Sequence, residues 1–195
     1  TVSAQDPRVE LSGTLGWTFS DGVNVGSIDD SPIQVGPKDA FSWGARLGFN
    51  LSPNVELGFL FASQATDLEA SGVINRSLPQ TVYNYHGYFA YNFGDTDAAV
   101  RPYFLGGIGA TQYGSLDTAI GEIGGETQFS STWALGLKMF PSPKFGLRLE
   151  TRWTPTYIKT DPEGYWCDPY WGCYTVGDAE FSNQFELSGG IIIWF

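Results

Sequence analysis

The sequence is poor in charge, above all in basic residues, and it has no long apolar run. Charged residues make up 16% of the 195 positions, against roughly 25% in an average soluble domain. Lysine and arginine number 10 against 21 aspartates and glutamates, so the net charge is −11 and the chain is expected to repel nucleic-acid phosphates. No stretch approaches the roughly 20 consecutive apolar residues of a spanning helix, which excludes a helical membrane protein.

Methionine, histidine and cysteine are also scarce, with one, one and two copies, whereas the chain has 25 glycines and 31 aromatic residues. A hydrophobic content of 42% with this aromatic load can bury a large core, which excludes an intrinsically disordered chain. The length fits one domain over residues 1–195. Residues 1–7 have neither a basic region nor an apolar run, so no signal peptide is visible and the chain is either cytoplasmic or a mature form.

Apolar residues alternate with polar ones along most of the chain. Near the C-terminus they fill every second position from Phe185 to Phe195, and near the N-terminus from Val9 to Phe19. Strands of this length exceed the roughly 5–6 residues that are typical of soluble proteins. They match the roughly 9–11 tilted residues of a membrane-crossing strand. The pattern therefore predicts transmembrane β-strands.

Eight such segments occur, and the connections between them alternate in length. The segments are 8–19, 39–51, 55–66, 80–93, 100–113, 126–140, 145–158 and 182–195. Turns 52–54, 94–99 and 141–144 are short, whereas loops 20–38, 67–79, 114–125 and 159–181 are long and polar. This alternation predicts an all-β fold: an eight-stranded antiparallel up-and-down transmembrane barrel with short periplasmic turns and four long extracellular loops. Closure is required because an open sheet edge would leave unpaired backbone groups in lipid.

The two faces of the predicted strands differ in chemistry. One face carries aliphatic and aromatic side chains, with the aromatics mainly near the segment ends, as in an interfacial girdle. The other face is small and polar and holds charges. Six bases and four acids are assigned to it, provided that Arg101 points inward: Arg8, Glu10, Arg46, Glu56, Arg101, Lys138, Arg148, Glu150, Arg152 and Glu186.

An eight-stranded barrel has an interior just wide enough to be filled by side chains. Since an unpaired buried charge is costly, these bases and acids are expected to form an interior ion-pair network rather than to line an open channel. Glycines on the same face leave room for the long side chains: Gly16, Gly44, Gly48, Gly58, Gly136 and Gly146. A soluble lipocalin-like barrel would instead have an apolar interior and a polar exterior.

Three stretches carry a resemblance to a known family. They are Arg101-Pro-Tyr-Phe-Leu-Gly-Gly-Ile-Gly-Ala, Phe145-Gly-Leu-Arg-Leu-Glu-Thr-Arg-Trp and the alternating end Gly189-Gly-Ile-Ile-Ile-Trp-Phe195. The chain resembles the OmpA/OmpX-like small outer-membrane barrels over essentially its whole length. The resemblance implies the outer membrane of a Gram-negative bacterium, contact with lipid and lipopolysaccharide, and Phe195 as the signal read by the barrel assembly machinery. It therefore favours a mature chain whose signal peptide has been removed, with residues 1–7 as a short periplasmic segment.

The long loops hold the whole net charge of the chain. They carry fourteen acids against three bases, Lys38, Arg76 and Lys159. The acids are Asp21, Asp29, Asp30, Asp39, Asp67, Glu69, Asp117, Glu122, Glu126, Asp161, Glu163, Asp168, Asp178 and Glu180. Carboxylates are the oxygen ligands that divalent cations prefer, but no twelve-residue calcium loop is present. The acids therefore either bind divalent cations or only keep the loops solvated. No other cofactor or metal site is expected.

The fourth long loop combines two cysteines with five aromatic residues. Cys167 and Cys173 enclose five residues around a proline and a glycine, which suits a disulfide formed in an oxidising compartment better than a zinc or redox site. The aromatics either form a recognition patch for an extracellular protein, glycan or lipid headgroup, or fold back over the barrel mouth. They are Tyr165, Trp166, Tyr170, Trp171 and Tyr174.

The family fold hosts adhesins, anchors, pores, carriers and a few lipid-modifying enzymes, so the resemblance does not fix an activity. His86 is the only histidine and is predicted to point inward from mid-strand, with no nucleophile beside it in sequence. We therefore expect no enzyme and no catalytic residue. The first hypothesis is a structural or surface-interaction barrel that acts through its loops. The alternatives are a small pore or carrier for small or hydrophobic solutes and, last, a lipid-modifying enzyme.

Overall fold

The computed structural model describes residues 9–21, 23–28, 31–71, 76–95, 98–118, 121–142, 144–159, 165–168, 172–175 and 179–195. All regular secondary structure in these residues is β. Within the same residues, no helix is long and apolar enough to cross a membrane.

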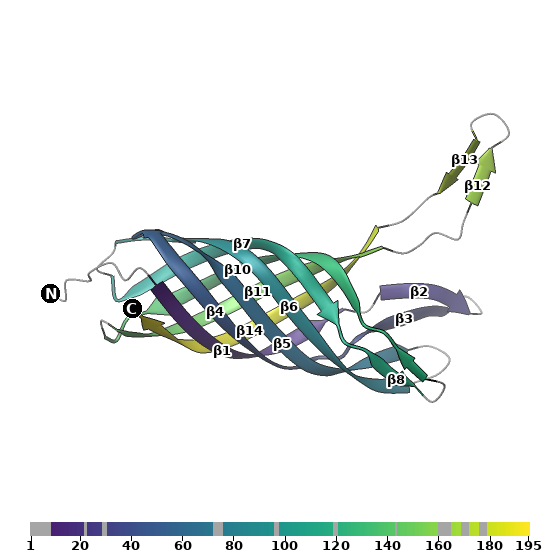
Figure 1. Ribbon diagram of the computed structural model, residues 1–195, viewed down its shortest axis with the longest axis horizontal. Helices are drawn as coiled ribbons and strands as arrows, with labels where there is room; N and C mark the ends of the chain where they lie inside the picture. The colour runs from purple at the N-terminus through teal and green to yellow at the C-terminus, as the bar shows by residue number, and fades with distance from the viewer. Residues whose placement is uncertain are drawn as a thin grey trace.

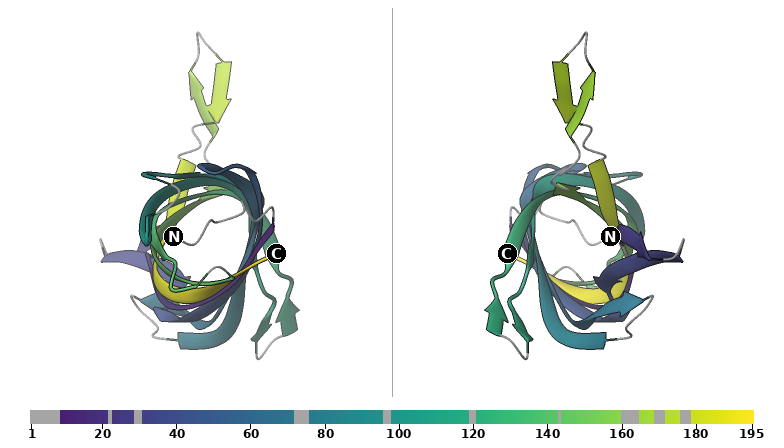
Figure 2. Two further views of the ribbon diagram at one scale, coloured as in Figure 1. Left: turned by 90° about the vertical axis from the view of Figure 1, so that its left-hand side faces the viewer. Right: turned by 90° about the vertical axis from the view of Figure 1, so that its right-hand side faces the viewer.

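Eight long strands form a closed antiparallel barrel. They are β1 (Val9–Ser20), β4 (Ala40–Ser52), β5 (Val55–Ser71), β6 (Arg76–Asn92), β7 (Val100–Tyr113), β10 (Glu126–Met139), β11 (Phe145–Lys159) and β14 (Ala179–Trp194). Each pairs with the next along the chain, and the pairing of β1 with β14 closes the ring. Figure 2 shows this ring end-on, and Figure 1 shows that β1 begins where β14 ends. The predicted fold class is therefore confirmed.

Three hairpins lie in segments that the sequence analysis assigned to loops. They are β2 (Val23–Ile28) with β3 (Ser31–Pro37), β8 (Leu116–Thr118) with β9 (Gly121–Ile123), and β12 (Tyr165–Asp168) with β13 (Gly172–Thr175). Strands β5 and β6 also run on to Ser71 and back from Arg76, beyond the predicted limits at residues 66 and 80. Outside the membrane-spanning part, neither face of a strand has to be apolar. Strands can therefore pair there without the alternation of apolar and polar residues from which strands are predicted.

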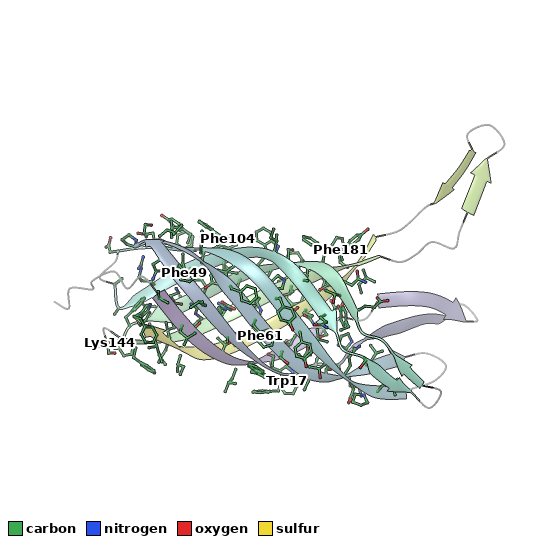
Figure 3. All side chains as sticks on the ribbon, viewed as in Figure 1. Trp17, Phe49, Phe61, Phe104, Lys144 and Phe181 are labelled. Carbon is green, nitrogen blue, oxygen red and sulfur yellow. The ribbon has the colours of Figure 1, made fainter. Side chains whose placement is uncertain are left out.

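Burial alternates along the barrel strands in the sense that the sequence predicts. In β4 the odd-numbered residues from Phe41 to Leu51 are exposed, whereas Ser42, Gly44, Arg46 and Gly48 are buried. Apolar and aromatic side chains cover the outside of the barrel, as Figure 3 shows for Trp17, Phe49 and Phe104. Arg101 is only 7% exposed, so the fifth barrel strand has the orientation that the sequence left conditional.

Candidate functional site

The half of the interior nearest the short turns is filled by a branched ion-pair network. Glu10 lies at its centre and accepts hydrogen bonds from Lys138 Nζ at 2.7 Å, from Arg148 Nη2 and from Trp194 Nε1 at 3.2 Å. Lys138 Nζ also lies 2.5 Å from Glu56 Oε2. The four charged side chains are at most 3% exposed. The ion pairs thus tie β1 and β5 to the neighbouring strands β10 and β11 across the barrel.

A second part of the network lies closer to the middle of the barrel. Arg46 donates two hydrogen bonds to Glu150, and the hydroxyl of Tyr103 donates a third to the same carboxylate. The guanidinium of Arg148 lies 5.2 Å from the centre of the Tyr103 ring. Tyr103 thereby links the Arg46–Glu150 pair to the Glu10 cluster.

A third ion pair lies nearer the mouth with the long loops. Arg152 Nη2 is 2.5 Å from Glu186 Oε2, which also accepts hydrogen bonds from Ser42 Oγ at 3.0 Å and Thr18 Oγ1 at 3.4 Å. These hydroxyls satisfy acceptor positions that the single arginine leaves free. Such added hydrogen bonds make a buried ion pair tolerable in a low-dielectric interior.

Nine of the ten predicted interior charges have described side chains, and all nine point inward. Arg8, the tenth, lies outside the described residues. Arg101 donates a hydrogen bond to the backbone oxygen of Pro53 at 2.9 Å, so it anchors the turn between β4 and β5. Tyr88, Tyr103 and Trp194 also belong to the network, which the sequence pattern did not predict, because each donates a hydrogen bond to one of its glutamates.

The inward-facing glycines are the sequence feature from which these inward-pointing aromatic side chains could have been predicted. A Cβ atom added at Gly58 would lie 2.6 Å from the ring of Tyr88, and one added at Gly136 would lie 2.6 Å from the ring of Tyr103. The glycines therefore accommodate rings rather than leaving open space. On the same wall, Leu60, Leu105 and Ala134 are at most 3% exposed and complete a filled interior.

Neutral polar side chains occupy the interior on the long-loop side of the Glu10 and Glu150 ion pairs. His86 is fully buried, and its Nε2 lies 2.9 Å from Ser130 Oγ. Thr111 Oγ1 lies 3.0 Å from Ser130 Oγ and donates its hydrogen bond to Asn84 Oδ1 at 2.7 Å. Asn84 donates in turn to Gln184 at 3.1 Å. The barrel thus brings a serine to His86, which the sequence order does not reveal.

The contacts of His86 suit a structural hydrogen-bond network. Among the described residues, no side chain is a partner for its Nδ1. A hydrolytic triad needs an acid that orients the histidine through this atom and a path for substrate to the serine. The fully buried pair therefore lacks two elements of that geometry within the described part of the chain.

The pairing of β10 with β11 is interrupted at a proline. Paired residues flank the gap at Ser130↔Thr156 and Trp133↔Trp153, and Pro155 lies within it. Proline has no N–H to donate to a neighbouring strand. On its other side, β11 pairs with β14 continuously through Pro155 and Asn183. The missing donor therefore faces β10.

The long loops are described only in part. Asp21 and Asp39 are exposed beside the end of β1, where the carboxylate of Asp39 accepts a hydrogen bond from the backbone N–H of Ser20 at 3.0 Å. Among the side chains that the structure describes, no three His, Cys, Asp or Glu residues gather as a metal site. Most of the loop acids have side chains outside this set, so cation binding stays a prediction.

The cysteines and aromatic residues of the fourth long loop are placed only by their backbone. In the β12–β13 hairpin, Cys167 lies directly opposite Cys173 and Trp166 opposite Tyr174. The side chains of the predicted recognition patch and of both cysteines lie outside the described residues, as do Tyr170 and Trp171 entirely. The disulfide and the patch therefore stay predictions.

Comparisons with known proteins agree with this architecture. A family model described as "Outer membrane protein beta-barrel domain" matches residues 1–184. No curated protein matches the chain. Among solved structures, Neisserial surface protein A is 14% identical, with 96% of this chain and 97% of that chain covered and a TM-score of 0.65.

Two further structures show the same fold. The outer membrane protein OprG from Pseudomonas aeruginosa is 9% identical, with 97% of this chain and 98% of that chain covered and a TM-score of 0.63. Ail, the attachment invasion locus protein of Yersinia pestis, was solved with the heparin analogue sucrose octasulfate. It is 14% identical, with 95% and 99% of the two chains covered and a TM-score of 0.51. At these identities the likeness concerns the fold alone.

Proposed function

The chain belongs to the outer membrane protein β-barrel domain family, and from this premise we propose that it is a surface-interaction protein. Its barrel is a filled anchor in the outer membrane, and its long loops form an acidic, aromatic-rich extracellular face that binds a partner. The family hosts several activities, so the argument rests on the interior and the loops of this chain.

The observation that carries the proposal is the filled interior. Glu10, Lys138 and Glu56 connect β1, β10 and β5 across the barrel, and the Arg46–Glu150 pair connects β4 with β11. Opening an aqueous path through these contacts would separate buried ion pairs, which is strongly unfavourable when one partner is left alone. A barrel closed in this way supports an anchor better than a pore.

The charge of the loops indicates the chemistry of the partner. Fourteen acids against three bases produce a negative potential over the extracellular face. Such a face attracts basic protein segments and repels polyanions. A polyanion such as the sucrose octasulfate bound to Ail requires a positively charged face, whereas this face is negatively charged. We propose a basic extracellular protein as the partner, with lipopolysaccharide contacting the barrel wall.

A binding measurement on the full chain in lipid nanodiscs tests this function. We expect a lysine-rich peptide to bind with an affinity that falls as salt rises from about 0.05 to about 0.5 M, because added ions screen exposed charges. A glutamate-rich peptide of equal length and sucrose octasulfate are expected not to bind.

Two variants place the binding on the extracellular side. The double variant Asp21→Asn/Asp39→Asn is expected to bind the lysine-rich peptide with an affinity several-fold lower. The control Asp95→Asn removes an exposed acid from the turn between β6 and β7 at the opposite end of the barrel. Equal loss in both variants, or no binding of the cationic peptide, would contradict the proposal.

The interruption at Pro155 favours a second candidate function, a carrier with a lateral opening for apolar solutes. Thr132 and Thr154 lie within the gap and are buried, with their hydroxyl oxygens 3.4 Å apart. We expect Pro155→Thr to restore the missing backbone hydrogen bond and to slow the entry of an apolar dye into lipopolysaccharide-containing vesicles. Pro102→Thr is the control, because Pro102 lies in an uninterrupted pairing with Leu137. Equal entry rates in both variants exclude this carrier.

We also propose that Cys167 and Cys173 form a disulfide in the β12–β13 hairpin. Directly opposite residues of an antiparallel pair have Cα atoms about 4.5–5.5 Å apart, within the range that a disulfide spans. An isolated two-stranded hairpin is only marginally stable in water, so the disulfide would stabilise the β12–β13 hairpin. We expect thiol labelling only after reduction, and labelling of the untreated native protein would refute the disulfide.

A further inference from the structure

Four strands continue as one sheet beyond the outer end of the barrel. Residues 34–37 of β3 pair with residues 68–71 of β5, and β2 pairs with the other side of β3. The pairing of β5 with β6 also extends to Ala70. The strand order of this extracellular sheet is therefore β2-β3-β5-β6. Figure 1 shows β2 and β3 projecting past the barrel at the end opposite the end of β14.

The two edges of the extracellular sheet differ. The β6 edge carries Arg76 and Pro79, and the N–H of Gly114 donates to the oxygen of Thr81 at 2.8 Å, which covers part of it. Strand β2 reads Val-Asn-Val-Gly-Ser-Ile, with neither a charge nor a proline. Among the strands that the structure describes, none pairs with the outer edge of β2.

An edge of this kind is a ready template for another strand. Proteins usually protect exposed edges with charges, prolines or bulges, because unpaired N–H and C=O groups recruit further chains. The register shift between Asn24 and Gly26 leaves Val25 as an extra residue on β2, so β2 carries an irregularity of this kind at its centre. The irregularity leaves the outer edge of β2 uncovered. The β6 edge carries a charge and a proline, whereas β2 has neither.

The flanks of β2 select the charge of an added strand. Asp21 precedes β2, and Asp29 and Asp30 follow it in the sequence. Acidic residues therefore adjoin both ends of β2 in the sequence, and an extended segment paired with β2 is expected to be attracted to them if its own ends are basic. A second copy of this chain carries the same acidic loops, so repulsion disfavours pairing between copies.

We propose that the outer edge of β2 is a strand-addition site for an extended basic polypeptide segment with an uncharged β-forming core. Backbone hydrogen bonds to the edge would supply affinity, and lysine or arginine residues at both ends of the segment would supply selectivity. This inference rests on the proposed function, since it names the partner chemistry and binding mode of the same acidic face.

Peptides with methylated backbone nitrogens separate strand addition from simple charge attraction. The probe is the capped peptide Lys-Lys-Thr-Val-Thr-Val-Thr-Val-Lys-Lys, with N-methyl groups either on the threonines alone or on all six core residues. Successive N–H groups of a strand point to opposite edges. The version methylated on the threonines alone keeps one complete edge of N–H groups that it can turn toward β2, and we expect it to bind like the unmodified probe.

The version methylated on all six core residues loses about three backbone hydrogen bonds to β2. At about 0.5–1.5 kcal/mol each, this loss lowers affinity roughly tenfold or more. On the protein, Val25→Lys places a positive charge on β2 and is expected to reduce binding of the probe. Val25→Thr adds no charge and is expected to leave the binding unchanged. Ala99→Lys is the control, with the same charge change at the opposite end of the barrel.

The outcomes separate this inference from the proposed function. If the fully methylated probe binds as well as the unmodified one, strand addition is wrong while attraction of basic partners stands. The same holds if Val25→Lys and Ala99→Lys behave alike. If neither this probe nor the lysine-rich peptide binds the nanodisc-embedded chain, both proposals fail. Self-association of the purified protein through Val25 would identify a second copy as the occupant and would also overturn the inference.

Discussion

Replacing Glu10 with glutamine is expected to lower the free energy of unfolding by about 3–5 kcal/mol, the usual cost of leaving a buried charge without its partner. Glu10 accepts hydrogen bonds from Lys138, Arg148 and Trp194, and its side chain is 2% exposed. Removal of its charge leaves Lys138 and Arg148 facing each other, with Glu56 as the remaining acid bound to Lys138 among the described residues. Denaturant unfolding of the barrel in lipid vesicles measures the effect.

Glu126→Gln provides the control for this prediction. Glu126 lies at the exposed start of β10 and accepts a local hydrogen bond from Gln128. Its replacement is expected to change stability by less than about 0.5 kcal/mol. The double variant Glu10→Gln/Lys138→Met, which removes one cation together with the acid, is expected to recover part of the loss. A Glu10→Gln protein as stable as Glu126→Gln would show that the interior charges are not held as buried pairs.

Replacing Gly58 with valine is expected to destabilise the barrel by about 1–3 kcal/mol or to prevent its assembly, as overpacking of a filled interior does. A Cβ at this position would clash with the backbone oxygen of Leu47 and would lie 2.6 Å from the Tyr88 ring. Tyr88 cannot move away freely, because its hydroxyl donates to Glu56 at 2.5 Å. The heat-induced shift in gel mobility of the folded barrel, with unfolding in vesicles, measures the loss.

Gly87→Val tests whether the effect belongs to the interior face. Gly87 is paired with Phe59 on the neighbouring strand but points outward, and an added Cβ would have nothing within 4 Å. We expect this variant to fold with nearly unchanged stability. A similar loss at both glycines would assign the effect to strand propensity instead of interior packing.

The barrel could be predicted from the sequence because lipid imposes a strict rule. Every spanning strand must have an apolar outer face, so residues such as those from Phe41 to Leu51 alternate over the whole span. The short turns and the inward charges follow from the same alternation. The direction of Arg101 followed only from the structure, because glycines weaken the alternation in its strand.

The parts beyond the membrane could not be predicted in this way. The β2–β3 hairpin alternates only over the short runs Val23-Asn-Val25 and Ile33-Gln-Val35, and its pairing with β5 depends on residues more than thirty positions away. The partners within the interior were also hidden. Tyr103 reaches Glu150 across 47 residues of sequence, and His86 meets Ser130 across 44. Such contacts depend on the register of the closed ring.

The most direct test of the central claim is the conductance of the purified chain in a planar lipid bilayer. If the ion pairs around Glu10 and Glu150 close the barrel, the bilayer carries no stable, discrete, salt-dependent current steps across a wide voltage range. Stable openings of uniform size, scaling with salt concentration, would contradict the filled barrel and would assign the chain to the small pores.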